Sequence, residues 1–128
     1  MAPPGTLLVE DDDLRAVTAE FLRDMDSTVY EAPDGKPALE RLRTHPEGLV
    51  VLLDLMMPEM DGYAVLEAVA AESPLATRRA YILVSATSRI FPLTLAATLK
   101  QLNVTSVPKP FDLDELLAAV QKAASTLH

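Results

Sequence analysis

Hydrophobic residues occur along this chain in two alternating patterns: short, nearly unbroken runs and longer segments with helical spacing. Runs such as 6–9 and 81–84 have the length and composition of buried β-strands. Between the runs, apolar residues recur at steps of three and four, as Leu14, Val17 and Phe21 do, which is typical of one face of an α-helix. The pair of patterns repeats five times with short connections, which predicts a doubly wound α/β fold.

The expected strands and helices can be placed from these patterns. The strands are 6–9, 28–30, 49–53, 81–84 and 105–107, and the apolar faces of the helices lie within 14–25, 38–42, 65–69, 95–102 and 113–120. Asp61 and Asp112 stand where N-caps are needed. Strand 49–53 has no polar alternation, so both its faces should be covered, whereas Pro108 places the last strand at a sheet edge. We expect a five-stranded parallel sheet with five helices, for which one common doubly wound order is the flavodoxin-like 2-1-3-4-5.

Residues whose side chains can bind a cation or an anion gather at the ends of the predicted strands. Glu10 and Asp11 end the first strand, Asp54 ends the third, Ser85 ends the fourth, and Lys109 follows the fifth. In an open parallel sheet, ligands bind beyond the carboxyl ends of the strands, where the strand order reverses. For the order 2-1-3-4-5 this point lies between strands one and three, so the acidic residues flank it.

The residue types at this edge favour phosphoryl transfer. Neighbouring carboxylates repel one another and raise each other's pKa, and a hard divalent cation relieves that repulsion. Mg²⁺ suits a site that must also accept phosphate oxygens. Lys109 and Ser85 would complete a cradle for an anion, and a carboxylate can act as nucleophile to give an acyl phosphate.

Four segments, in the right order and spanning nearly the whole chain, resemble the receiver domains of bacterial response regulators in two-component signalling. They are Leu7 to Asp12 at the first strand, Asp54 to Gly62 at the phosphoacceptor, Val84 to Ala86 at the fourth strand, and Lys109 to Phe111 at a Lys-Pro turn.

The resemblance implies a role for each candidate residue. Asp54 would be the phosphorylated aspartate, Lys109 the cation that neutralises the phosphoryl group, and Ser85 the hydroxyl that turns towards it. Mg²⁺ would be held by four residues, which are Asp11, Asp54, Met56 through its backbone carbonyl, and Glu10 through water.

The implied function is signalling. We expect 1–128 to form one receiver domain with a flexible N-terminus at 1–5. It would accept a phosphoryl group from a sensor histidine kinase or phosphotransfer protein and assist its own phosphorylation and dephosphorylation, without being an enzyme otherwise. Its output would pass to a downstream protein or a second copy, through a surface that includes Ile90 and Phe91.

Composition limits the partners and the compartment. The chain has 11 basic and 19 acidic residues, a net charge of −8, which argues against direct binding to nucleic acid or to anionic membranes. Its longest apolar run, 49–57, contains Asp54 and is too short to cross a bilayer. With no cysteine and no signal peptide pattern, a cytoplasmic protein is expected.

Two alternatives remain beside this interpretation. A haloacid-dehalogenase-like phosphatase also uses an aspartate nucleophile, but it needs a second acid two residues later, where this chain has Met56. A degenerate receiver would bind partners without phosphorylation. Ser106 keeps that alternative open, because the family usually has an aromatic switch residue at this position.

Overall fold

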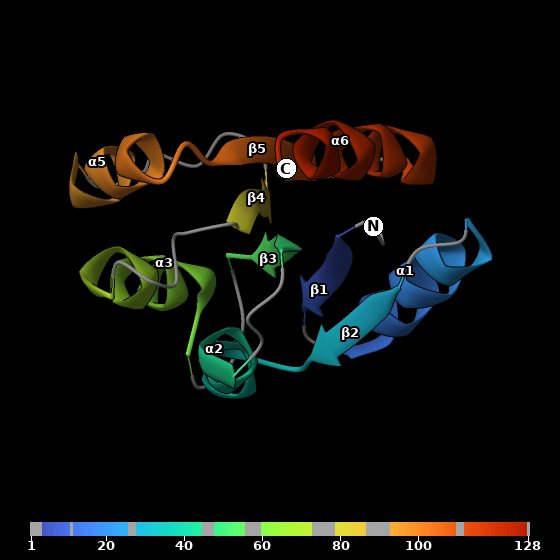
Figure 1. The fold of residues 1–128 in the computed structure, drawn as a ribbon, viewed down its shortest axis with the longest axis horizontal. Coiled ribbons are helices and arrows are strands. Elements are labelled where there is room, and N and C mark those ends of the chain that lie inside the picture. Colours follow the sequence, from blue (N-terminus) through green and yellow to red (C-terminus); the bar gives the residue numbers. More distant parts are fainter. Residues whose placement is uncertain are drawn as a thin grey trace.

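The computed structural model describes residues 4–10, 12–25, 28–44, 48–55, 60–72, 79–86, 93–109 and 112–127. Strands and helices alternate along the chain (Figure 1). The strands are β1 (Gly5–Val9), β2 (Val29–Ala32), β3 (Leu49–Asp54), β4 (Arg79–Ala86) and β5 (Thr105–Lys109). The helices are α1 (Asp12–Asp24), α2 (Gly35–Thr44), α3 (Gly62–Ala71), α5 (Leu93–Gln101) and α6 (Leu113–Ser125).

The five strands form one parallel sheet in the order β2-β1-β3-β4-β5, which confirms the predicted topology. Helices α1 and α6 cover one face, and α2, α3 and α5 cover the other (Figure 1). All six residues of β3 are buried, as expected for a central strand with two covered faces. Strand β5 lies at the edge, where Pro108 was expected to place it.

Alternation of side chains divides the sheet into two hydrophobic cores. Val51 and Leu53 of β3 pack with residues of α2 and α3, whereas Val50 and Leu52 pack with residues of α1 and α6. Each fully buried leucine contributes about 1.5–3 kcal/mol through removal of its apolar surface from water. Because successive strand residues point to opposite faces, Asp54 continues the row of Val50 and Leu52, on the side of α1 and α6.

Helix starts follow the predicted capping pattern. The Asp61 carboxylate accepts a hydrogen bond from the backbone N–H of Ala64 at 2.9 Å, and Asp112 accepts one from Glu115 at 2.7 Å. Both aspartates therefore satisfy backbone donors that a helix leaves open at its N-terminus. The pKa of Glu115 is raised because its protonated carboxyl can donate a hydrogen bond to Asp112, whose charge also repels it.

All five strands differ from the ranges expected. Strand β1 begins at Gly5, one residue earlier, and β2 covers 29–32 in place of 28–30. Strand β3 ends one residue later, at Asp54, and β4 covers 79–86 in place of 81–84. Strand β5 continues through Pro108 to Lys109, since an edge strand has one side on which a missing N–H costs no ladder hydrogen bond.

Candidate functional site

Two acidic residues lie side by side at the carboxyl end of the sheet. Val9 of β1 pairs with Leu53 of β3, so the next residues, Glu10 and Asp54, are neighbours across the two strands. Glu10 is 1% exposed and Asp54 is 7% exposed. Burying two carboxylates close together is unfavourable unless a cation or hydrogen-bond donors offset their charge. The two carboxylates therefore favour the binding of a cation between them, at the position where the strand order reverses.

Backbone contacts fix the start of the segment that follows Asp54. The N–H of Leu55 donates to the carbonyl of Val84 at 3.0 Å, and the N–H of Gly62 donates to the carbonyl of Leu55 at 3.1 Å. A Cβ atom on Gly62 would lie 2.5 Å from the carbonyl oxygen of Asp54, closer than real Cβ contacts come. Glycine is needed there because α3 begins directly against the backbone of Asp54.

Arg15 is a neighbour of the acidic pair that sequence reasoning missed. Its guanidinium donates to the backbone carbonyl of Glu10 at 3.0 Å and to the Glu31 carboxylate at 3.3 Å. The contact ties α1 and β2 to the end of β1. Only the position of Arg15 in the first turns of α1, five residues after Glu10, could have suggested it.

For two of the remaining predicted site residues the structure describes the backbone, and the others lie outside the described residues. The register pairs Asp54 with Val84 and Ala86 with Lys109, so the backbones of Ser85 and Lys109 lie at the same end of the sheet as Asp54. The structure does not describe the side chains of Ser85 and Lys109. Asp11 and Met56, the other predicted metal ligands, lie outside the described residues, as do Ile90 and Phe91.

The donor chemistry of the described pair fits a hard cation. Mg²⁺ prefers carboxylate, carbonyl and water oxygens, and Glu10 and Asp54 supply two buried carboxylates. Within the described ranges alone, no cluster of three potential His, Cys, Asp or Glu ligands occurs. Asp11, the third acid of the predicted set, follows Glu10 directly in the chain.

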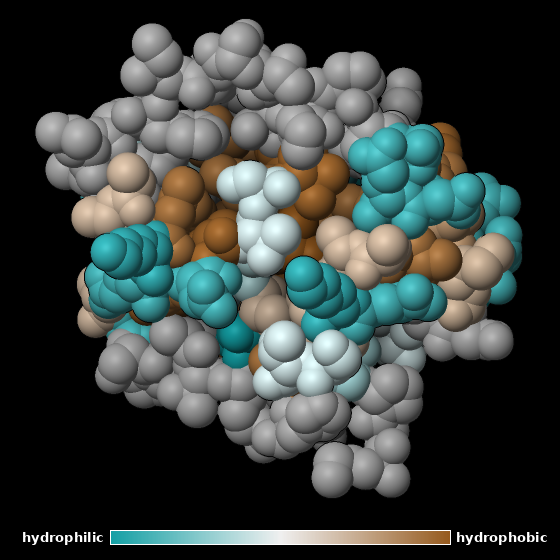
Figure 2. Space-filling view, turned by 90° about the horizontal axis from the view of Figure 1, so that it is seen from above, coloured by the Kyte–Doolittle hydropathy of each residue, from teal (hydrophilic) through white to brown (hydrophobic). Residues whose placement is uncertain are grey.

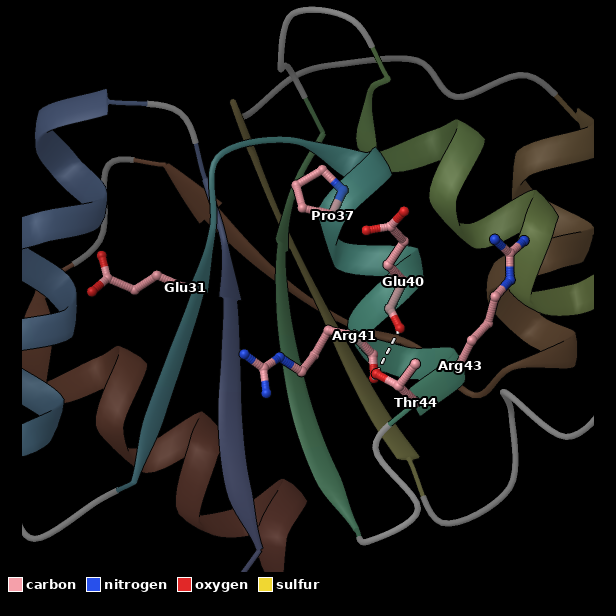
Figure 3. Close-up of a pocket in the computed structure, with 6 residues that line it drawn as sticks. All are labelled: Glu31, Pro37, Glu40, Arg41, Arg43 and Thr44. Atoms are coloured by element: carbon pink, nitrogen blue, oxygen red, sulfur yellow. Dashed lines mark hydrogen bonds between the residues drawn. The ribbon is translucent and has the colours of Figure 1, made fainter.

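A groove of about 640 Å³ lies elsewhere, where α2 flanks β2 (Figure 3). It is lined by Glu31, Pro37, Glu40, Arg41, Arg43 and Thr44, none of which belongs to the predicted site. Its two arginines already have partners. The guanidinium of Arg41 lies 4.6 Å from the centre of the Tyr30 ring, and Arg43 pairs with Glu72 at 2.8 Å, which raises the pKa of Arg43.

The edge at β5 presents a different surface. Figure 2 looks onto this edge, where hydrophobic surface is visible between more polar parts of the flanking helices. Thr105 and Ser106 are exposed there, and Leu99, Leu102 and Val104 are half-buried against the core. At position 106, where receiver domains usually carry an aromatic residue, this chain thus has a small, exposed polar side chain.

Fold and site together define a flavodoxin-like α/β domain with a buried acidic pair between β1 and β3. The family model for the response regulator receiver domain matches residues 6–121. This chain belongs to the response regulator receiver domain family. In the described part of the chain, no helix has the length and apolar character needed to span a membrane.

Known relatives agree with this assignment. A two-component response regulator of rice is 41% identical over 75 residues, which cover 58% of this chain and 51% of that protein. The transcriptional regulatory protein ZraR of Escherichia coli is 34% identical over 124 residues, or 95% of this chain and 27% of that protein. The chain thus spans about half or less of the length of these curated relatives.

Solved structures show the same fold. A CheY-like receiver domain protein from Methanospirillum hungatei superposes with a TM-score of 0.81 at 26% identity, covering 96% of each chain. The BeF3-activated receiver domain of nitrogen regulatory protein C superposes with a TM-score of 0.73 at 31% identity, covering 98% of each chain. Both neighbours are receiver domains, in agreement with the family match.

Proposed function

We propose that this receiver domain accepts a phosphoryl group on Asp54 from a sensor histidine kinase or a phosphotransfer protein, with Mg²⁺ as cofactor. The observation that carries the proposal is the buried pair of Glu10 and Asp54 at the carboxyl ends of adjacent strands. Membership of the receiver family supports it, because that family is part of two-component signalling.

In the proposed transfer, a carboxylate oxygen of Asp54 attacks the phosphorus atom of the donor. A new P–O bond forms, and the bond from phosphorus to the donor's leaving atom breaks, with its electron pair remaining on that atom. The product is an aspartyl phosphate. The contacts of Leu55 and Gly62 hold the backbone of the nucleophile in place.

The charges at this site need compensation. Asp11, Asp54, the backbone carbonyl of Met56 and, through water, Glu10 would hold the cation. When bound, Mg²⁺ supplies positive charge that offsets the carboxylates and the phosphoryl oxygens. Lys109 contributes a second positive charge and Ser85 a hydroxyl donor to the phosphorylated state. The same groups assist hydrolysis of the aspartyl phosphate, so the domain promotes its own phosphorylation and dephosphorylation.

In the proposed function, the protein works in the cytoplasm and passes its signal to a downstream protein or to a second copy of itself. Its net charge of −8 disfavours direct binding to nucleic acid or to an anionic membrane, because both are negatively charged. Output through a surface that includes Ile90 and Phe91 would make that region change on phosphorylation. The BeF3-activated state of the receiver of nitrogen regulatory protein C supports a distinct activated state here too.

Intact mass measurement after incubation with Mg²⁺ and acetyl phosphate tests the proposal. The wild-type chain should gain one phosphoryl group, and Asp54→Asn should gain none. Asp24→Asn, a change of the same kind at an exposed position at the end of α1, should label like the wild type. Undiminished labelling of Asp54→Asn would reject Asp54 as acceptor, and no labelling of the wild type would reject the function.

A further inference from the structure

The turn before α2 lies directly against the segment that precedes α3. The backbone N–H of Gly35 donates a hydrogen bond to the carbonyl of Met60 at 3.1 Å. Gly35 is buried, and the two residues are 25 positions apart in sequence (60 − 35). The contact therefore joins the β2–α2 connection to the β3–α3 connection, which carries the residues that follow Asp54.

A side chain at position 35 does not fit beside this contact. A Cβ atom would lie 2.6 Å from Cγ2 of Val65, 2.7 Å from Cγ of Met60 and 2.9 Å from the carbonyl oxygen of Met60. The two side chains can rotate away, but the carbonyl belongs to the backbone. Any residue other than glycine must therefore displace the backbone at Met60 or give up the hydrogen bond.

The β3–α3 connection is thus held from both sides. On one side, Gly62 contacts the backbone of Asp54 and Leu55, as described above. On the other side, Met60 is bonded to Gly35. Met60 lies two residues before Gly62, and Gly62 is bonded to Leu55, the residue that follows the proposed ligand Asp54. A shift of the backbone at Met60 would consequently reach the backbone of Asp54 through Gly62 and Leu55.

We infer that Gly35 is a positioning residue for Mg²⁺ binding, which it supports through Met60 without touching the metal. The inference rests on the proposed function, because it takes Asp54 as a ligand of Mg²⁺. Coupling between two sites is reciprocal. If the Gly35–Met60 contact favours the metal-binding conformation, then Mg²⁺ binding must stabilise that contact to the same extent.

The first test compares two crowded glycines at opposite ends of the sheet. Gly5 is the control, because its Cβ would lie 3.0 Å from Cε2 of Tyr30, at the amino end of β1. In isothermal titration, Gly35→Ala should raise the Mg²⁺ dissociation constant roughly five- to tenfold, within the usual range of coupling, and Gly5→Ala should leave it unchanged. Equal constants for Gly35→Ala and the wild type would overturn the inference.

The second test needs no variant and therefore does not depend on how Gly35→Ala folds. Hydrogen exchange of the wild-type protein is followed by NMR with and without saturating Mg²⁺. The Gly35 amide should exchange several-fold more slowly with Mg²⁺, whereas the Thr6 amide, bonded to Thr28 at the other end of the sheet, should not change. Exchange of Gly35 that is insensitive to bound Mg²⁺ would refute the coupling. A wild-type protein that neither binds Mg²⁺ nor labels with acetyl phosphate would refute the proposed function itself.

Discussion

Thr18 is a fully buried residue of α1 whose hydroxyl has no hydrogen-bond partner within the described residues. A buried hydroxyl without a partner costs about 1–3 kcal/mol, so an apolar group of the same shape is preferable. We predict that Thr18→Val raises the free energy of unfolding by about 1 kcal/mol. Urea denaturation measures the change.

Thr44→Val is the matched control for this prediction. The Thr44 hydroxyl donates to the carbonyl of Glu40 at 2.9 Å, and the residue is exposed on α2. Its replacement should leave stability within about 0.5 kcal/mol, as is usual for surface positions. If Thr18→Val were less stable than the wild type, the hydroxyl would have a partner that stabilises it.

Single residues also show where the sequence could predict the site and where it could not. Asp54 was predictable, because a carboxylate that ends a five-residue apolar run is costly to bury without a function. Arg15 and Gly35 were not predictable, since their contacts join segments that meet only after the helices pack on the sheet. No periodicity in the sequence indicates such a meeting. The side-chain roles of Ser85 and Lys109 stay predictions.

Among the elements, β2 is one of the two edge strands of the sheet, so one of its sides has no neighbouring strand. Thr6 donates to the carbonyl of Thr28, so the carbonyl of Val29, on the alternate side, faces the open edge. Arg23 of α1 donates to that carbonyl at 2.9 Å and pairs with Glu31 at 3.1 Å. A charged residue that occupies an edge carbonyl blocks pairing with a strand from another molecule.

We predict that Arg23→Ala increases self-association of the protein. The ion pair itself contributes little, about 0–1 kcal/mol, because both partners are partly exposed. The effect should therefore appear as a higher weight-average mass in sedimentation at high concentration, with a small change in stability. Arg41→Ala, on α2 against Tyr30, is the control and should sediment like the wild type. Monomeric behaviour of Arg23→Ala would mean that the edge is protected in another way.

Element boundaries show a second limit of pattern analysis. Strand β2 was expected to end at Tyr30, shortly before the turn at 33–35. In the structure it continues to Ala32, and Glu31 points to exposed surface and binds Arg15 and Arg23 from α1. The strand is longer than expected because Glu31 and Ala32 also pair with Leu8 and Val9 of β1. Caps were better predicted, because Asp61 and Asp112 act on neighbours within three residues.

At the scale of the whole molecule, the parallel sheet and its central strand followed from two features of the sequence, whereas the order 2-1-3-4-5 came with the resemblance to receiver domains. The five repeats of strand and helix require a parallel sheet, and the unbroken apolar run at 49–53 requires a central strand covered on both faces. Both requirements are met by β3 and its two cores. The same topology brings Glu10 and Asp54 to the adjacent ends of β1 and β3, where two carboxylates would repel each other and favour a cation.

On the proposed function, Mg²⁺ binding at this site should stabilise the entire domain. A ligand that binds only the folded state stabilises it by mass action, by about 2.7 kcal/mol at a concentration one hundred times its dissociation constant. We predict that Mg²⁺ at this excess raises the melting temperature by several degrees, as about 2.7 kcal/mol does for a chain of this size. NaCl at equal ionic strength should not. Differential scanning calorimetry compares the two conditions.

Asp54→Asn separates the two parts of this explanation. It removes one of two adjacent buried charges, so in EDTA the variant should melt above the wild type. It also removes a proposed ligand, so Mg²⁺ should raise its melting temperature less than that of the wild type. Glu67→Gln, a loss of one negative charge at an exposed position on α3, should change neither value. If Mg²⁺ and NaCl acted alike on the wild type, or if Asp54→Asn melted below it in EDTA, repulsion between Glu10 and Asp54 would not be what links metal binding to folding.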